Sequence, residues 1–280
     1  MNWEKIKKIV IWILIGMNVV LFGFNSKKDQ KYILSSERER AIYSVLARHN
    51  IGMYTQAVSR FDDMRRISVE IPEFSRDELA EDFFPGEESE YIVEDDWMGI
   101  AAESGEIMFK DEEFEYYSYA QGQKIPDFSE EGAREAAEGF VKSHGKTFEN
   151  FQPENVEKVG ESYVCTYAGV YKGYRIFCMN LTVSVNEYGV RGAAGSLFSI
   201  RGYYGLSSPI CAPDEALMTL LHSIETDGQT RFITEMDLGY DLQESGDVSG
   251  NLKLVPCYYM YLQGESRPII VDAYTNEIKS

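Results

Sequence analysis

Apolar residues recur at helical spacing in three segments of the chain, which predicts three amphipathic helices. The first covers residues 35–50, where Ser35 or Ser36 can cap the start. The second follows the capping residues 127–130, and the third opens at Pro213, a residue favoured in the first helical turn. The predicted inward residues are Ala41, Ile42, Val45, Leu46 and His49 in the first helix; Ala133, Ala136, Ala137, Phe140, Val141 and His144 in the second; and Ala216, Leu217, Leu220, Leu221 and Ile224 in the third.

Alternating apolar and polar residues predict strands between and after these helices. Residues 53–60 and 65–71 suggest a hairpin, and residues 90–119 suggest a meander. Both the second and the third helix are followed by strand-like runs and a similar polar turn, which makes a weak internal repeat. The sequence therefore predicts an α+β fold with two or three units, each made of one helix on one antiparallel sheet.

An uncharged apolar run at residues 9–24 lies between lysines on both sides. This pattern predicts a transmembrane helix over residues 9–25, with residues 1–8 in the cytoplasm and the rest outside it. A cleaved signal peptide is the main alternative, because it also has a basic start and a short apolar core. No small-x-small cleavage site follows Phe24, so an uncleaved anchor is favoured and a single-pass membrane location is expected.

The remainder of the chain is long enough for a real core and divides best at the short polar segment 121–126. The predicted parts are an N-terminal α+β subdomain over residues 26–124 and a C-terminal one over residues 125–280. Four cysteines lie in these parts, Cys165, Cys178, Cys211 and Cys257. Cys165 and Cys178 flank a predicted turn, and a disulfide and free buried thiols are equally consistent with their positions.

The formal net charge of −19 repels phosphates, so a nucleic-acid partner is excluded. Residues 70–115 carry 18 Asp and Glu residues against the two basic residues Arg76 and Lys110, a local charge of −16. A solvated face is the favoured interpretation, and a site for a basic partner or for calcium is the alternative. Calcium is disfavoured because no EF-hand loop pattern is present.

Catalytic patterns are missing from the sequence. Its three histidines, His49, His144 and His222, are widely spaced and each lies in a predicted helix. No zincin, nucleophile-elbow or P-loop motif and no C-x-x-C pair occurs. We therefore expect a protein that is not an enzyme and that has no cofactor and no metal.

The predicted anchor contains Asn18, with Gly16 two residues earlier. A polar side chain in hydrocarbon is best tolerated when a neighbouring helix offers a hydrogen bond, and glycine lets helices approach closely. The equal alternative is an Asn18 side chain bonded to its own backbone.

Several segments together resemble the YycI-type regulatory proteins of Gram-positive bacteria and their YycH relatives. The segments are residues 1–7 with the apolar run that follows, 173–177 (GYRIF), 185–189 (VNEYG), 213–217 (PDEAL), 238–240 (LGY), 254–256 (LVP) and 271–278 (VDAYTNEI). The resemblance implies that residues 125–280 hold two PepSY-like units.

The resemblance further implies a non-enzymatic accessory regulator of a sensor histidine kinase (YycG or WalK type) that controls cell-wall metabolism. Such proteins contact the kinase through the transmembrane helix and the external domain, often together with a YycH partner. Joined to the argument on the anchor, this role makes Trp12, Gly16 and Asn18 the candidate contact residues. A PepSY-like inhibitor or chaperone of a secreted peptidase is the alternative function.

Overall fold

The computed structural model describes residues 7, 11–18, 32–120, 122, 124–126, 128–224, 228–243, 252–265 and 267–279. Most of the predicted segments 1–8 and 9–25 therefore lies outside the described residues, and residues 11–18 are helical. No helix within the described ranges is both long enough and apolar enough to cross a membrane. This finding corrects two predictions, the transmembrane helix and the single-pass membrane location with an exported domain. The apolar run at residues 9–24 is shorter than the roughly 20 residues that usually span a bilayer.

The chain divides into two compact units, and each is assembled from separate stretches of sequence. Unit 1 comprises residues 1–64, 207–237 and 257–280, and unit 2 comprises residues 65–206 and 238–256.

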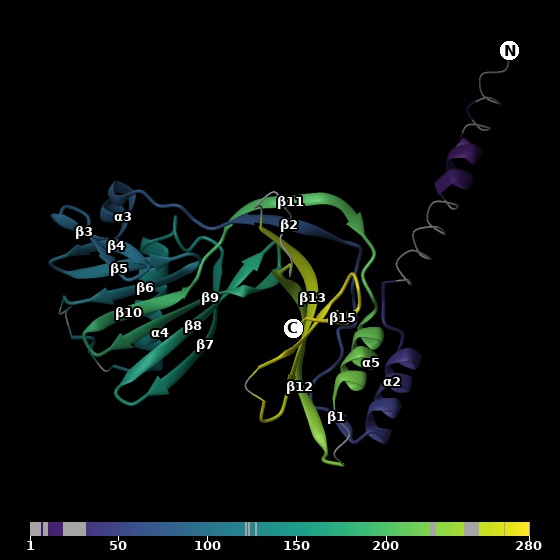
Figure 1. The fold of residues 1–280 in the computed structure, drawn as a ribbon. Helices are drawn as coiled ribbons and strands as arrows, with labels where there is room; N and C mark the ends of the chain where they lie inside the picture. The colour runs from purple at the N-terminus through teal and green to yellow at the C-terminus, as the bar shows by residue number, and fades with distance from the viewer. Residues whose placement is uncertain are drawn as a thin grey trace. The chain divides into compact units, whose positions relative to one another are not determined.

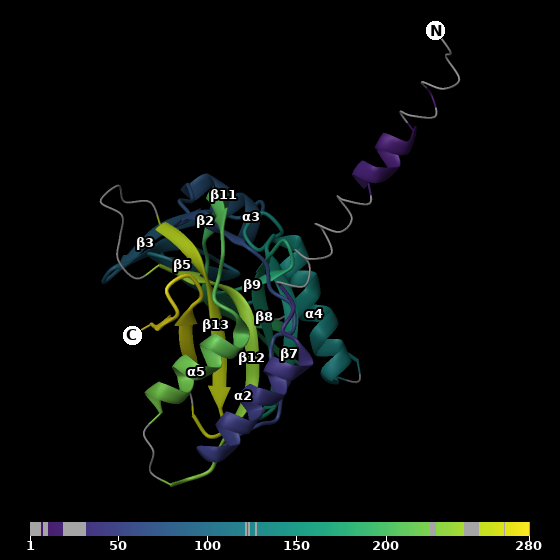
Figure 2. The same ribbon diagram turned by 90° about the vertical axis from the view of Figure 1, so that its right-hand side faces the viewer.

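From residue 32 onward, the described part of unit 1 combines two helices with strands of different lengths (Figure 1). Its elements are α2 (Ser36–Arg48), β1 (Ile51–Met53), α5 (Pro213–Ser223), β14 (Ile269–Asp272), β15 (Glu277–Ile278), and the unit 1 residues of β12 (Arg231–Leu242) and β13 (Leu252–Leu262). Strand β1 runs parallel to β12, whereas β14 is antiparallel to both β13 and β15. Helices α2 and α5 lie side by side (Figures 1 and 2).

Local sequence signals position both helices of unit 1. Ser35 is the N-cap of α2, and its side chain accepts a hydrogen bond from the Arg38 amide, as expected. Pro213 is the first residue of α5, where its missing N–H costs nothing. The inward faces are buried as predicted at Leu46 and Leu217, which are both fully enclosed. Ala41 and His49, which were also predicted to face inward, are exposed, so the core follows the predicted helical periodicity only in part.

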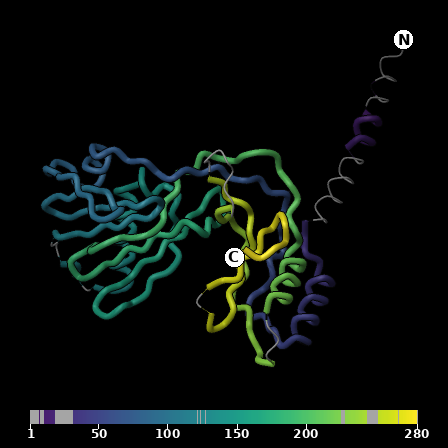
Figure 3. Tube along the Cα trace, in the orientation of Figure 1, coloured from purple at the N-terminus to yellow at the C-terminus, as the bar shows by residue number. Residues whose placement is uncertain are grey.

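Unit 2 is mostly sheet, with α3 (Arg76–Phe83) and α4 (Glu130–Ser143) packed on it. Its strands are β2 (Met64–Glu70) from Arg65 onward, β3 (Ser89–Glu94), β4 (Trp97–Ala102), β5 (Gly105–Lys110), β6 (Glu113–Ser118), β7 (Phe151–Val159), β8 (Ser162–Tyr171), β9 (Tyr174–Asn186), β10 (Gly189–Ser196), β11 (Ser199–Ser208) up to Leu206, and the unit 2 residues of β12 and β13. Strands β3 to β6 form an antiparallel meander that can be followed in Figure 3. Strand β6 then pairs with β10, β10 with β9, β9 with β8, and β8 with β7.

An aromatic cluster fills the space between the helices and the sheet of unit 2. Phe83 of α3 and Phe140 of α4 both approach Tyr116 of β6, with ring centroids 5.6 and 5.2 Å away. Phe114 and Phe148, which are almost completely buried, extend the same cluster at 5.4 Å from each other. Burial of these large apolar surfaces is the main force that holds α3 and α4 on the sheet.

The described residues are mostly mixed β-sheet, so the prediction of repeated helix-on-antiparallel-sheet units is wrong. Turn residues indicate where one strand is followed by the next along the chain. Several strands, however, pair with strands that are far away in the sequence. Ile51 of β1 lies opposite Arg231 of β12 in parallel register, which also removes the predicted hairpin of residues 53–60 and 65–71. Strand β12 in turn pairs in parallel with β9 through Tyr240 and Ile176. None of the four cysteines forms a disulfide.

Candidate partner-binding site

The three contact residues predicted from the sequence lie together on helical residues 11–18. The Trp12 side chain is 71% exposed, and a Cβ added at Gly16 would meet no described atom within 4 Å. The Asn18 side-chain amide donates a hydrogen bond of 2.9 Å to the Leu14 carbonyl, one turn earlier. This hydrogen bond corresponds to the second alternative given for Asn18, in which its side chain bonds to the backbone of its own helix. Partner binding by these residues stays a prediction.

The three histidines end up at three separate helix ends. His49 is the C-cap of α2, His144 is the C-cap of α4, and His222 lies in the last turn of α5. Of these, only His144 is substantially buried, with its side chain 12% exposed. It is therefore the histidine to test for acid–base chemistry.

His144 is packed among aromatic rings beside the Asp82 carboxylate. Its ring stacks on Phe83 with centroids 4.3 Å apart and meets Phe140 edge-on at 4.6 Å. Among the described residues the buried Nδ1 atom has no hydrogen-bond partner, since the 3.8 Å to Asp82 is too long for one. Burial lowers the pKa of His144, and the Asp82 charge offsets part of that effect.

The Asp82 carboxylate also has a structural role in this cluster. Thr147 donates a hydrogen bond of 2.9 Å to the second oxygen of Asp82, so the carboxylate ties α3 to the segment that follows α4. Of the phenylalanines around His144, Phe83 stacks on one ring face and Phe140 meets the ring edge-on. Within the described ranges, no group of three His, Cys, Asp or Glu side chains is placed to hold a metal ion.

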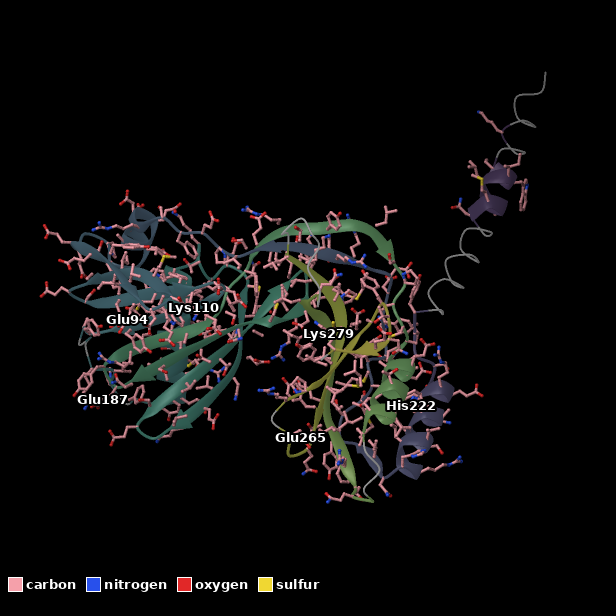
Figure 4. The ribbon with its side chains drawn as sticks, in the orientation of Figure 1. Glu94, Lys110, Glu187, His222, Glu265 and Lys279 are labelled. Atoms are coloured by element: carbon pink, nitrogen blue, oxygen red, sulfur yellow. The ribbon has the colours of Figure 1, made fainter. Side chains whose placement is uncertain are left out.

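Unit 1 instead presents a groove between α2 and α5, which we call the α2–α5 groove. Its volume is about 480 Å³. Figure 4 labels His222, which belongs to the α5 wall. The lining residues are Arg38, Ala41, Ile42 and Val45 from α2, Asp214, Glu215, Met218, Thr219 and His222 from α5, and Asn276.

One end of the groove is set by a forked ion pair. The Arg38 guanidinium donates to both carboxylate oxygens of Asp214, at 2.8 and 2.7 Å, and lies 3.7 Å from Glu215. The Arg38 side chain is 45% exposed, so the pair contributes only about 0.2–1 kcal/mol to stability. Its main effect is geometric, because the planar fork fixes the spacing of the two helices at this end.

The turn at Asn276 forms another part of the groove lining. Asn276 has a left-handed φ of 57°, which asparagine tolerates better than most residues, and its carbonyl accepts a bond of 3.3 Å from the Thr219 hydroxyl. Its side-chain Oδ1 is buried with no hydrogen-bond partner in the described part of the chain.

The groove offers an apolar contact surface. Apolar side chains of α2 and α5 face it, and its carboxylates are already engaged with Arg38 or, for Glu215, with the Ala212 amide at 3.1 Å. Sequence periodicity places Ala41 and Val45 on the apolar face of α2, but it did not identify Arg38, Met218 or Asn276. Their roles depend on the pairing of segments more than 170 residues apart, such as Arg38 with Asp214.

Comparisons with known proteins bear on the fold alone. No family model matches the chain, and no curated protein does. A solved structure of an uncharacterized protein from Eubacterium rectale ATCC 33656 matches with a TM-score of 0.57 at 12% identity, covering 82% of this chain and 91% of that one. The C-terminal domain of YpeB from Bacillus megaterium covers 75% of this chain and 96% of its own, at 14% identity and a TM-score of 0.40. The first match shows a shared fold; the second is too distant to decide about a PepSY-like unit, and neither shows the YycI-type family.

Proposed function

We propose that this chain is a non-enzymatic accessory regulator that binds a sensor histidine kinase of the YycG or WalK type. The α2–α5 groove is the binding site in this proposal, and it receives an apolar segment of the kinase. The observation that carries the proposal is the position of residues 213–217, which form the start of α5 and supply Asp214 and Glu215 to the groove. The same five residues are part of the resemblance to the YycI-type regulators.

The physical basis for binding is burial of apolar surface. Ala41, Val45 and Met218 face the groove and remain accessible to solvent. Covering such surface stabilises a complex by about 25 cal/mol for each Å² removed from water. The Arg38–Asp214 fork holds the two helices in place before binding, so less conformational entropy is lost when a partner binds.

Two alanines of α2 provide a matched test. Ala41 and Ala47 are both exposed, but only Ala41 lines the groove. Ala41→Glu places a charged side chain in the groove, whereas Ala47→Glu makes the same change outside it. The assay is co-purification of the full chain with the sensor kinase co-expressed from the same genome, with thermal melting to verify that both variants fold.

We expect Ala41→Glu to abolish co-purification and Ala47→Glu to leave it unchanged. Equal co-purification of both variants would show that the groove is not the site. A kinase that does not co-purify with the unmodified chain contradicts the proposed function itself.

A further inference from the structure

The meander of unit 2 ends at a strand with one open side. Among the described strands, β3 pairs only with β4, in an unbroken antiparallel register from Ser89 opposite Ala102 to Glu94 opposite Trp97. The other side of β3 therefore presents unpaired backbone N–H and C=O groups, which are a template for another strand. The Arg76 guanidinium occupies the Ser89 carbonyl, which leaves residues 90–94 as the open stretch. We call this stretch the β3 edge.

Apolar side chains accompany the β3 edge on one face of the sheet. Val93 lies opposite Met98 and Tyr91 lies opposite Ile100, so these four side chains share a face. That face is completely buried at Ile100 but open at Tyr91, Val93 and Met98, which are 55%, 62% and 54% exposed. The core face of the sheet thus continues to the β3 edge with nothing in the described part of the chain to cover it.

Acidic side chains accompany the same edge on the other face. On that face Glu90 and Glu94 lie on either side of Ile92, and residues 87–96 contain six acidic residues and no basic one. Figure 4 labels Glu94, and also Lys110, whose ammonium group is engaged with Asp96 at 3.2 Å. A hollow of about 570 Å³ opens beside Ser89 and is lined by carboxylates of Glu88, Glu90 and Glu103 together with Arg76.

Strand β7, another outer strand of unit 2, has features that hinder the addition of a further strand. Strand β7 pairs only with β8 among the described strands, and it carries Pro153 and a bulge between Pro153 and Asn155. Proline and bulges prevent further strand pairing. Strand β3 has neither device. Its acidic side chains repel a second copy of the same edge and attract a basic one, so charge complementarity selects the partner.

We propose that the β3 edge binds an extended peptide segment of another protein by strand addition, and that this segment alternates Lys or Arg with apolar residues. In an added strand, every second side chain would meet Tyr91 and Val93, and the intervening ones would meet Glu90, Ile92 and Glu94. Backbone bonds supply affinity and the alternation supplies specificity. This surface lies in unit 2 and is independent of the proposed kinase-binding groove.

The test uses the full chain and fluorescence polarisation of labelled peptides at low salt. The probe is Lys-Val-Lys-Val-Lys-Val-Lys, and its control is Lys-Lys-Lys-Lys-Val-Val-Val, with the same composition and charge. Two further probes carry N-methyl groups on the lysine or on the valine amides, so that one of them loses the bonds to the β3 edge. We expect the alternating peptide to bind about tenfold more tightly than the block peptide, and one of the two methylated peptides to lose binding.

Two protein variants locate the site. Val93→Lys places a charge on the β3 edge, and Val159→Lys makes the same change at the end of β7, where the valine is 55% exposed. We expect weakening by about tenfold for Val93→Lys and no change for Val159→Lys, with both variants equally stable in thermal melting. Equal binding of the alternating and block peptides would reduce the interaction to charge attraction and overturn the proposal. Equal weakening by both variants, or no binding of the alternating peptide, would overturn it as well.

Discussion

Replacing Tyr258 with phenylalanine tests how the first turn of α5 is held. The Tyr258 side chain is fully buried, and its hydroxyl donates a hydrogen bond of 2.9 Å to the Cys211 carbonyl. The Cys211 amide in turn donates to the Ala273 carbonyl at 2.7 Å, so both backbone groups of Cys211 are engaged just before α5 begins. Burial raises the pKa of Tyr258, which keeps the hydroxyl protonated and the bond intact across the physiological range.

The expected cost can be worked out from this geometry. Phenylalanine keeps the ring and its packing, so the change removes one hydroxyl and one hydrogen bond. A neutral hydrogen bond contributes about 1 kcal/mol net, and a buried carbonyl left without a donor costs about 1–3 kcal/mol. We therefore expect Tyr258→Phe to lower the free energy of unfolding by about 1–3 kcal/mol.

Urea unfolding followed by circular dichroism measures this free energy, with Tyr204→Phe as the control because Tyr204 is 52% exposed. Hydrogen exchange gives a local reading, since peptides covering residues 211–218 should exchange faster in the Tyr258→Phe variant. A loss no greater than that of Tyr204→Phe, or unchanged exchange at the start of α5, would refute the reasoning.

Other predictions concern the core of unit 2. Because burial lowers the pKa of His144 below its ordinary value of 6.5, the unfolded chain binds the proton more readily, and stability should fall as the pH drops below about 6.5. His144→Phe should flatten this dependence in urea unfolding from pH 5 to 8, and an unchanged slope would contradict the assignment. Gly99→Ala should cost about 1–3 kcal/mol, because its Cβ would collide with the Ile107 carbonyl. Gly139→Ala, inside α4 with no atom within 4 Å of the new Cβ, should instead stabilise by about 0.5–1 kcal/mol, and thermal melting that ranks these two alanine variants the other way would contradict both.

Local signals in the sequence predicted local structure well. The cap at Ser35 and the proline at Pro213 were correctly read as helix starts. These signals succeed because each depends on hydrogen bonds or dihedral limits within a few residues. The inward face of α5 was also predicted, since periodicity alone decides which side of an amphipathic helix is apolar.

Pairing between distant segments could not be predicted in the same way. An alternating strand pattern says that one face is buried, but it does not say which strand lies alongside, so the parallel partner of β1 was missed. The α2–α5 groove was missed for the same reason. Arg38 looked like an ordinary solvated residue of a helix until Asp214 was placed beside it.

Both units are interleaved in the sequence, and this has a consequence for biosynthesis. Unit 2 receives its long stretch, residues 65–206, before the ribosome has made residues 207–237 and 257–280 of unit 1. Helix α2 is therefore synthesised long before α5 and before the buried residues Val271 and Ala273 of its own unit. Until then only the segment up to Met64, which includes β1, can cover the apolar face of α2, and its packing against α5 must wait until most of the chain has been made.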